Sequence, residues 1–509
     1  MSSAPRSSLL VVSDLHLGAA LRPPMTERSF EMIDKLDREL EQFLSYHIEN
    51  PAMTEEEIPL PWTLVFNGDT IDFMHMGLTV AEHIQLEAEE SLYGLSFVRR
   101  RSRWKLHEIA KHHHRAFKAL AHFIECGHQC VFVVGNHDAD LWFEKVRRDL
   151  CSLIARHTKR PKAAKRAIHF APWFYYEEGR VYIEHGHRFD AYSTFPDPLN
   201  PVDLESGEMK PTFGHWGLRY FCNPVPTLPI HDLEDWTASD FIKWAWTKAG
   251  VGLVSLVAFY LNFLWRYLKD TAEARISTGD KEDQDAESIR NRRRSKRLAR
   301  FAKKANLNLG RVRALDQLRE AHVGASLGRF ALAAHMDKIL IVISSGIGMI
   351  SLLIFTSGWV LYLSLFLGAV VLSLIWVGLA KLRPSQDPHP LMSEVAQKIG
   401  QITDVPLVVL GHTHRPVLQD DGDVKWLNPG SWEHLPRSNG HAIGAPCTCV
   451  AKFGVIKGEG DDMEVGLYQW CSARRSAELI ENFQGDEQEV LGKLSGSNDD
   501  TWSVQNEKT

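Results

Sequence analysis

The sequence LLVVSDLHLG, residues Leu9–Gly18, begins as a run of aliphatic and β-branched side chains and ends in Asp14 and His16. An apolar run of this length is typical of a buried strand. A carboxylate and an imidazole one residue apart at the end of such a strand are suitable metal ligands. Two ligands do not complete a metal site, so the rest of the chain must be searched for the others.

The same pattern, an apolar run followed at once by Asp, Asn or His, recurs four times. Ligands at the carboxyl ends of strands are expected of an open α/β sheet, because its binding crevice lies there. Helical patterns at Thr26–His47 and Trp104–Glu125 separate the first three runs, as crossover connections would. The four further runs are WTLVFNGDTIDF with Asp69 and Asp72, CVFVVGNHDAD with Asn136, His137 and Asp138, RVYIEHGHRFD with His185 and His187, and PLVVLGHTHRP with His412 and His414.

Together these motifs offer imidazole, carboxylate and amide ligands but no thiolate, a donor set that suits Mn²⁺, Fe or Zn²⁺. Two cations about 3.5–4 Å apart that share a carboxylate can clamp a phosphoryl group and generate a hydroxide between them. One D-x-H or H-x-H motif is a weak signal. Five motifs in order, each at a strand end, favour a two-metal site over a set of ordinary polar loops.

The ordered set D-x-H, G-D-x-x-D, G-N-H-D, H-G-H and G-H-x-H resembles the calcineurin-like metallophosphoesterase superfamily, over roughly Ser8–Asp190 and Pro406–Trp470. The resemblance implies an α/β fold, a two-sheet β-sandwich flanked by helices, and two divalent cations, with Mn²⁺ favoured. It also implies that His137 protonates the leaving oxygen or steadies the developing charge, and that Asp138 orients His137. The implied ligands are Asp14, His16, Asp69 and His414 for one metal and Asp69, Asn136, His185 and His412 for the other, with Asp69 bridging.

Some polar residues near these motifs have two interpretations. His187 and Arg415 either contact a substrate phosphate or are ordinary polar loop residues. Asp72 either supports a ligand or caps the helix that follows. The tract HHH at 112–114 lies in a helical pattern, where consecutive residues point in different directions, so we predict a solvated face there and not a metal site.

A long insertion separates the fourth motif from the fifth, and its segment Ile339–Ala380 contains no charged residue. As one helix this segment would measure about 63 Å, twice the thickness of a hydrocarbon core of about 30 Å. Ser357–Gly358 offers a break near the middle. We therefore predict a transmembrane hairpin at 339–380. The alternative, a pair of buried core helices, is disfavoured because soluble helices almost always carry a polar stripe.

A third apolar stretch, Ala249–Trp265, is shorter and contains two glycines and Asn262. Both halves of the predicted site must lie on one side of the membrane, so the number of crossings between them is even. If the hairpin provides two crossings, 249–265 lies in the membrane interface, aided by nearby tryptophans. In the alternative, this stretch crosses once and the hairpin region crosses once beside a re-entrant piece.

The basic segment 290–313 suggests the orientation. By the positive-inside rule it places the basic side of the hairpin, and the catalytic domain with it, on the cytoplasmic face. Its basic side chains either rest on anionic headgroups or form a solvated face paired with the acidic stretch before it. The predicted organisation is a catalytic domain in two parts, 1–235 and 386–475, a helical membrane insertion at 236–385, and a disordered acidic tail at 476–509.

The predicted function is a membrane-bound phosphoesterase or pyrophosphohydrolase in which a metal-bridging hydroxide attacks phosphorus. HGHRFD and GHTHRP are similar to the branch containing the UDP-2,3-diacylglucosamine pyrophosphohydrolases, which implies a lipid-linked substrate such as UDP-diacylglucosamine. The long insertion departs from that compact branch and leaves a nucleotide or a generic phosphodiester open. A phosphoprotein phosphatase and an inactive membrane scaffold are the alternatives. With 58 Lys and Arg against 64 Asp and Glu, a dedicated nucleic-acid binder is disfavoured.

Overall fold

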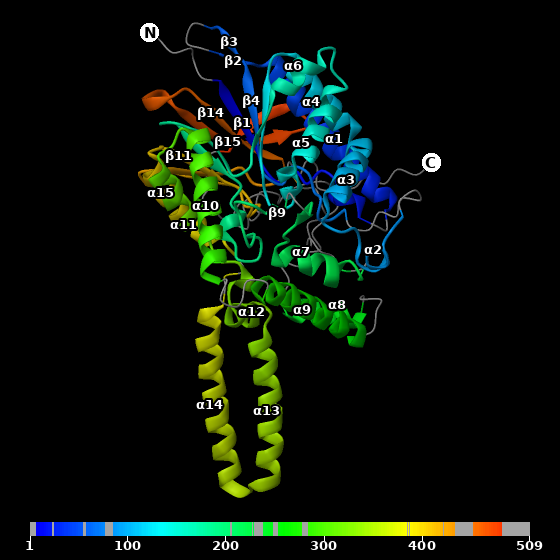
Figure 1. Cartoon of the computed structure of the whole chain (residues 1–509), viewed down its shortest axis with the longest axis vertical. Coiled ribbons are helices and arrows are strands. Elements are labelled where there is room, and N and C mark those ends of the chain that lie inside the picture. Colours follow the sequence, from blue (N-terminus) through cyan, green and yellow to red (C-terminus); the bar gives the residue numbers. More distant parts are fainter. Residues whose placement is uncertain are drawn as a thin grey trace, which may run out of the picture.

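The computed structural model of the chain contains two large β-sheets packed face to face, helices on both outer faces, and two long helices that project from one end (Figure 1). The predicted mixed α/β class is confirmed. The structure describes residues 7–22, 25–53, 57–76, 85–203, 206–225, 228, 238–247, 253–276, 283–383, 385, 387–420, 422–432 and 451–480.

The first sheet has seven strands in the order β16-β15-β14-β1-β4-β5-β6. Its parallel half contains the first three motif strands, and its antiparallel half comes from the end of the chain. Residues 476–479 form the edge strand β16, so the prediction that the disordered tail begins at 476 is wrong; residues 481–509 lie outside the described part. The strands are β1 (Ser8–Val12), β4 (Trp62–Asn67), β5 (Gln129–Val133), β6 (Ile168–Ala171), β14 (Lys452–Lys457), β15 (Glu464–Cys471) and β16 (Ser476–Leu479).

The second sheet has five strands in the order β12-β13-β11-β8-β7. Its central strands β8, β11 and β13 are parallel, so the fourth and fifth motifs follow neighbouring strands although the whole insertion separates them in sequence. The strands are β7 (Phe174–Glu177), β8 (Val181–Glu184), β11 (Leu407–Leu410), β12 (Val417–Gln419) and β13 (Lys425–Asn428). The two-stranded ribbons are β2 (Ala52–Met53) with β3 (Pro59–Leu60) and β9 (Val202–Asp203) with β10 (Glu208–Met209).

The alternation of side chains along the strands places one apolar core between the two sheets and one on the outer face of each sheet. Leu9 and Val11 of β1 pack with Ile183 and Val409 of the second sheet, in the apolar layer between the sheets. Leu10 and Val12 face the other way, into a larger core under the helices. Because β1 is buried on both faces, its sequence is a continuous apolar run and does not alternate with polar residues.

Helices from the crossovers of the first sheet cover its outer face, and α10, α11 and α15 pack on the second sheet. The predicted helix Trp104–Glu125 is broken at His113, which is buried with its Nδ1 2.7 Å from Asp37 Oδ1. The prediction of a solvated face at 112–114 is therefore wrong for His113. These helices are α1 (Glu27–Glu49), α3 (Arg99–His112), α4 (His114–Glu125), α5 (Glu144–Ala155), α6 (Pro161–Arg166), α10 (Asp283–Ala305), α11 (Leu309–Gln317) and α15 (His389–Thr403). The short helices α2 (Ala88–Tyr93) and α7 (Phe213–Gly217) contribute to a separate apolar cluster that they share with the insertion.

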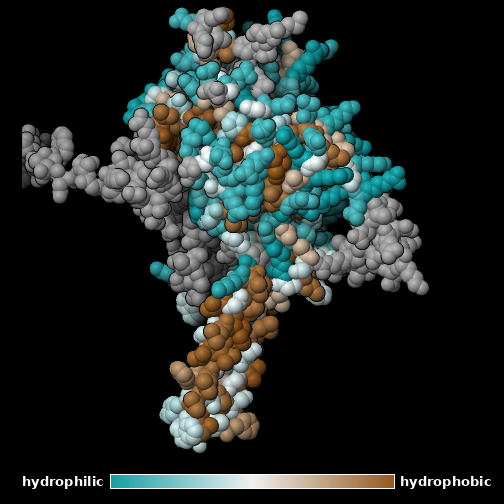
Figure 2. Space-filling model, turned by 90° about the vertical axis from the view of Figure 1, so that its left-hand side faces the viewer, coloured by the Kyte–Doolittle hydropathy of each residue, from teal (hydrophilic) through white to brown (hydrophobic). Residues whose placement is uncertain are grey.

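The projecting hairpin consists of α13 (Met336–Phe355) and α14 (Gly358–Leu382), and the predicted break is confirmed, with Gly358 in the left-handed region at φ +62°. At about 30 Å and about 38 Å both helices are long enough to cross a membrane, and their apolar windows contain no buried residue. Figure 2 shows the resulting hydrophobic rod below a largely hydrophilic body. An ion pair of 2.5 Å between Asp337 and Arg383 closes the root of the hairpin.

Three helices lie across the end of the body from which the hairpin projects: α8 (Ala238–Thr247), α9 (Leu253–Ile276) and α12 (Leu327–Ala333) (Figure 1). Among the described residues only α13 and α14 are long and apolar enough to cross a membrane. The predicted interfacial segment corresponds to the first half of α9, apart from 249–252, which lie outside the described part. Val254, Val257, Leu261 and Trp265 form an exposed apolar stripe along this half of α9, as an interfacial helix requires.

The basic segment 290–313 lies on α10 and α11, which run along the side of the body. Leu298 and Ala302 of α10 are buried against the second sheet. Arg294 pairs with Asp316 at 2.5 Å and Arg297 with Asp197 at 3.2 Å. One side of the basic helix therefore faces Asp316 of α11 and Asp197. The exposed basic side chains of α10 are Arg292, Arg293, Lys296, Arg300, Lys303 and Lys304.

Candidate metal centre

The motif loops turn sharply where the strands end. Asp14, His16, Asp69, His412 and His414 all have positive φ, between 49° and 69°. This left-handed conformation is unfavourable for residues with a side chain and is commonly retained where it serves a site. Here it directs the side chains that follow β1, β4 and β11 toward one another.

Glycines in the same motifs permit this close approach. A Cβ added to Gly135 would stand 2.1 Å from Asp69 Oδ1, and one added to Gly411 would stand 2.3 Å from Ser13 Oγ. Neither position can hold a side chain without moving a motif residue. The glycines in GNHD and GHTH are therefore explained by packing of one motif loop against another.

A first cluster joins Asp14, His16 and His414. Asp14 Oδ1 lies 3.1 Å from His414 Nε2 and 3.9 Å from His16 Nε2, and the two imidazole Nε2 atoms are 3.4 Å apart. Ser13 donates a hydrogen bond to the other oxygen of Asp14. Three of the four ligands predicted for the first metal thus converge on one point.

A second cluster joins Asp69, His185 and His412. His185 Nε2 lies 3.1 Å from Asp69 Oδ2 and 3.2 Å from Asn136 Oδ1. The other ring nitrogen, Nδ1, donates to the carbonyl of Asn67 at 2.8 Å, which leaves Nε2 with a lone pair for a metal. The ligands predicted for the second metal are therefore brought together as well.

The two clusters adjoin each other at the carboxylates. Asp14 Oδ1, which is 3.1 Å from His414 Nε2 of the first cluster, is 4.0 Å from His185 Nε2 of the second. Burial opposes ionisation of Asp14, but His414 and His185 outweigh it and lower its pKa to about 2. Burial likewise opposes ionisation of Asp69, but His185 and His137 hold its pKa well below the usual range. Buried ionised carboxylates facing several imidazole nitrogens fit divalent cations in charge and donor type.

Asp72 lies at the centre of a third group, and the orienting role predicted for Asp138 has to be revised. Asp72 Oδ2 lies 3.1 Å from His137 Nδ1, 3.1 Å from His16 Nδ1 and 2.5 Å from His75 Nδ1. The oxygens of Asp138 instead accept backbone N–H bonds from Gly135 and Thr70. Asp72 therefore orients His137, and Asp138 fixes the loop geometry.

Two further residues of the site were not assigned from the sequence. Asp190 Oδ2 lies 3.1 Å from His412 Nε2, from a position 222 residues earlier in the chain. His75 donates its backbone N–H to Asp72 Oδ1 at 2.8 Å. Each follows a ligand motif closely, in HGHRFD and GDTIDFMH, so their nearness to the motifs was the available signal.

The two predicted substrate-binding residues lie in different surroundings. His187 is buried beside His185, with ring centroids 5.5 Å apart, and its Nδ1 has no hydrogen-bond partner among the described residues. Arg415 is exposed and pairs with Asp387 at 2.7 Å. Arg415 is therefore held at the protein surface by an ion pair. Contact with a substrate stays a prediction for both His187 and Arg415.

No protein-family model matches this chain, and no curated protein matches it. In the described structure, buried histidine and aspartate groups at the ends of strands from both sheets are placed so that they could hold metal ions.

Proposed function

We propose that the chain is a membrane-bound, metal-dependent phosphoesterase of the calcineurin-like type. The observation that carries the proposal is the meeting of two His/Asp clusters at the carboxyl ends of strands from both sheets, where Asp14 Oδ1 lies within 4.0 Å of imidazoles from both. Sites with two neighbouring cations and oxygen and nitrogen ligands are typical of phosphoryl hydrolysis.

The seven predicted ligands would hold two divalent cations, with Mn²⁺ favoured. When bound, the cations would lower the pKa of a water molecule and offset the charge that develops on phosphorus. The protein would hold the ligands in place beforehand. Asn67 orients His185, Ser13 orients Asp14, and the left-handed turns at the strand ends direct the ligands toward one another.

His137 would act on the leaving group. Its Nδ1 faces the Asp72 carboxylate at 3.1 Å, so Nδ1 keeps a proton and Nε2 is directed toward the site, 4.0 Å from Asp69 Oδ2. A neighbouring carboxylate stabilises the imidazolium form, from which Nε2 can give a proton to the departing oxygen. Asp72 is thus a positioning residue for His137.

The hairpin supports a membrane-delivered substrate. It projects from the same end of the body as the exposed stripe of α9, so a bilayer around the hairpin would touch that end (Figure 1). The body would lie on the cytoplasmic face by the positive-inside rule. A lipid-linked phosphate ester or pyrophosphate, such as UDP-diacylglucosamine, is the proposed substrate class.

The test is metal-dependent hydrolysis by the detergent-purified chain. UDP-diacylglucosamine and an aryl phosphodiester would be compared with and without Mn²⁺, with Asp69→Asn as the control. Release of UMP well above the aryl reaction, lost in the variant, supports the lipid-linked substrate. Hydrolysis of the aryl ester alone retains the phosphoesterase and rejects that substrate. Equal turnover by wild type and Asp69→Asn would refute the metal assignment.

A further inference from the structure

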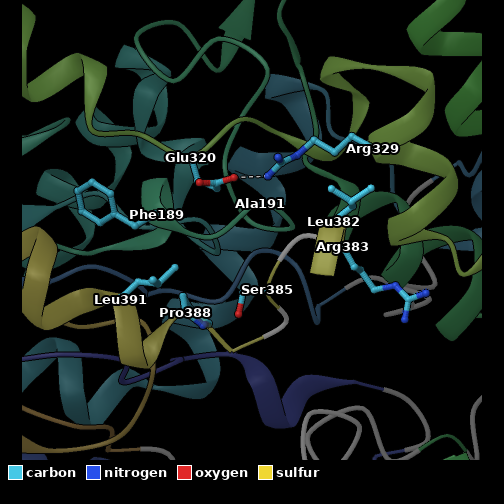
Figure 3. Close-up of a pocket in the computed structure, with 9 residues that line it drawn as sticks. All are labelled: Phe189, Ala191, Glu320, Arg329, Leu382, Arg383, Ser385, Pro388 and Leu391. Atoms are coloured by element: carbon cyan, nitrogen blue, oxygen red, sulfur yellow. Dashed lines mark hydrogen bonds and ion pairs between the residues drawn. The ribbon is translucent and has the colours of Figure 1, made fainter. Parts of the chain in front are cut away.

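A cavity of about 170 Å³ lies at the root of the hairpin, between the end of α14 and the loop that follows β8 (Figure 3). Leu382 and Arg383 line it where α14 ends, and Phe189 and Ala191 line it from the β8 loop. Asp190, between these last two, faces His412. The loop that follows β8 therefore separates the cavity from the metal centre.

The polar part of the lining contains two arginines. Arg329 of α12 pairs with Glu320 within the lining (Figure 3), and Arg383 pairs with Asp337 at the start of α13. A guanidinium carries five N–H donors. The Nε of Arg329 is buried and has no hydrogen-bond partner among the described residues. Arg329 therefore has a donor available for an anion with several oxygen acceptors.

The apolar part of the lining continues onto the hairpin. Leu382 is 70% exposed and Leu391 of α15 is 44% exposed, beside α13 and α14, whose apolar windows have no buried residue. The cavity is too small for a lipid with its acyl chains but has room for a phosphate headgroup. Chains leaving such a headgroup could follow the apolar surface of the hairpin. These features together favour a lipid over a soluble anion.

We propose that this cavity binds the anionic headgroup of a membrane phospholipid, with Arg329 as its principal hydrogen-bond donor. The site differs from the metal centre in position and in chemistry. The proposal rests on the membrane association in the proposed function and does not depend on catalysis. Glu320 occupies one edge of Arg329 and therefore competes with the lipid for it.

The experiment measures lipid binding by the full chain in detergent, using native mass spectrometry. Phosphatidylglycerol and phosphatidylcholine with identical acyl chains are titrated separately. We expect phosphatidylglycerol to bind about tenfold more tightly, and Arg329→Gln to weaken it about tenfold, as loss of a charge-assisted hydrogen bond would. Glu320→Gln should tighten binding, since it removes the competing carboxylate. Arg166→Gln, at an exposed position on α6 at the end of the body opposite the hairpin (Figure 1), is the matched control and should leave binding unchanged.

Three results would overturn the proposal: equal binding of the two lipids, unchanged binding in both Arg329→Gln and Glu320→Gln, or displacement of the lipid by millimolar inorganic phosphate. The last would indicate a site for a soluble anion. The opposite directions expected for the two variants separate a binding effect from a folding defect. Hydrolysis of an aryl phosphodiester by the same preparations tests the catalytic proposal separately, because a catalytically silent chain can still show this binding pattern.

Discussion

Asp69→Asn should remove much of the stability that the protein gains from Mn²⁺. Asp69 is buried, lies 3.1 Å from His185 Nε2, and accepts the backbone N–H of His137 at 2.8 Å. An asparagine of the same size can keep the N–H bond through its amide oxygen, but it removes the negative charge that a cation needs. The variant should therefore fold and lose metal affinity.

The expected magnitude follows from mass action. At a free Mn²⁺ concentration of about 100 Kd, each occupied site stabilises the folded state by about 2.7 kcal/mol, so two sites contribute about 5 kcal/mol. At about 2–4 °C per kcal/mol, the unfolding midpoint of the wild type should rise by roughly 10–20 °C over an EDTA-treated sample. Asp69→Asn should lose at least one site and show at most about half of this rise.

The assay is thermal unfolding in detergent with EDTA and with Mn²⁺. Asp37→Asn is the matched control, because Asp37 is also a buried carboxylate facing a histidine, His113, on the outer helices. That variant should start from a lower midpoint and keep the full rise with Mn²⁺. A full rise in Asp69→Asn would show that the cluster around Asp69 does not hold the metal.

Other variants test the remaining parts of the molecule. His137→Ala should lower turnover by about 10²-fold or more while bound metal, measured by atomic emission, stays at the wild-type level; a parallel loss of metal would make His137 a ligand instead. Replacing 339–380 by a short Gly-Ser linker should move the protein from the carbonate-resistant membrane fraction to the soluble one and keep the rise with Mn²⁺; continued membrane retention would assign the anchoring to the exposed stripe of α9. Burial lowers the pKa of His47 from 6.5 to about 4, and the hydrogen bond to the Phe43 carbonyl offsets only part of this effect. The unfolded chain therefore binds this proton first as the pH falls, and the stability present above pH 6.5 declines by about 3 kcal/mol between pH 6.5 and pH 4. In His47→Gln, the free energy of unfolding measured by denaturant titration should change little between pH 6.5 and pH 4. An identical decline in both proteins would exclude His47 as the cause.

The sequence by itself determined the features that depend on residues close to one another along the chain. An apolar run ending in Asp or His predicts both a strand and the side chain delivered at its end, and β1 and β11 agree with this. The uncharged segment 339–380 likewise predicted two long apolar helices with a break at Ser357–Gly358. Such patterns are visible locally because strand and helix periods fix which side chains share a face.

Only the tertiary structure decided which of several nearby polar groups meet. Asp72 and Asp138 both flank the site in sequence, yet Asp72 faces His137 and Asp138 binds backbone amides. Asp190 meets His412 only because β8 and β11 are adjacent in the second sheet. Such contacts join residues far apart in the chain, and they depend on strand order and sheet packing, which no local pattern encodes.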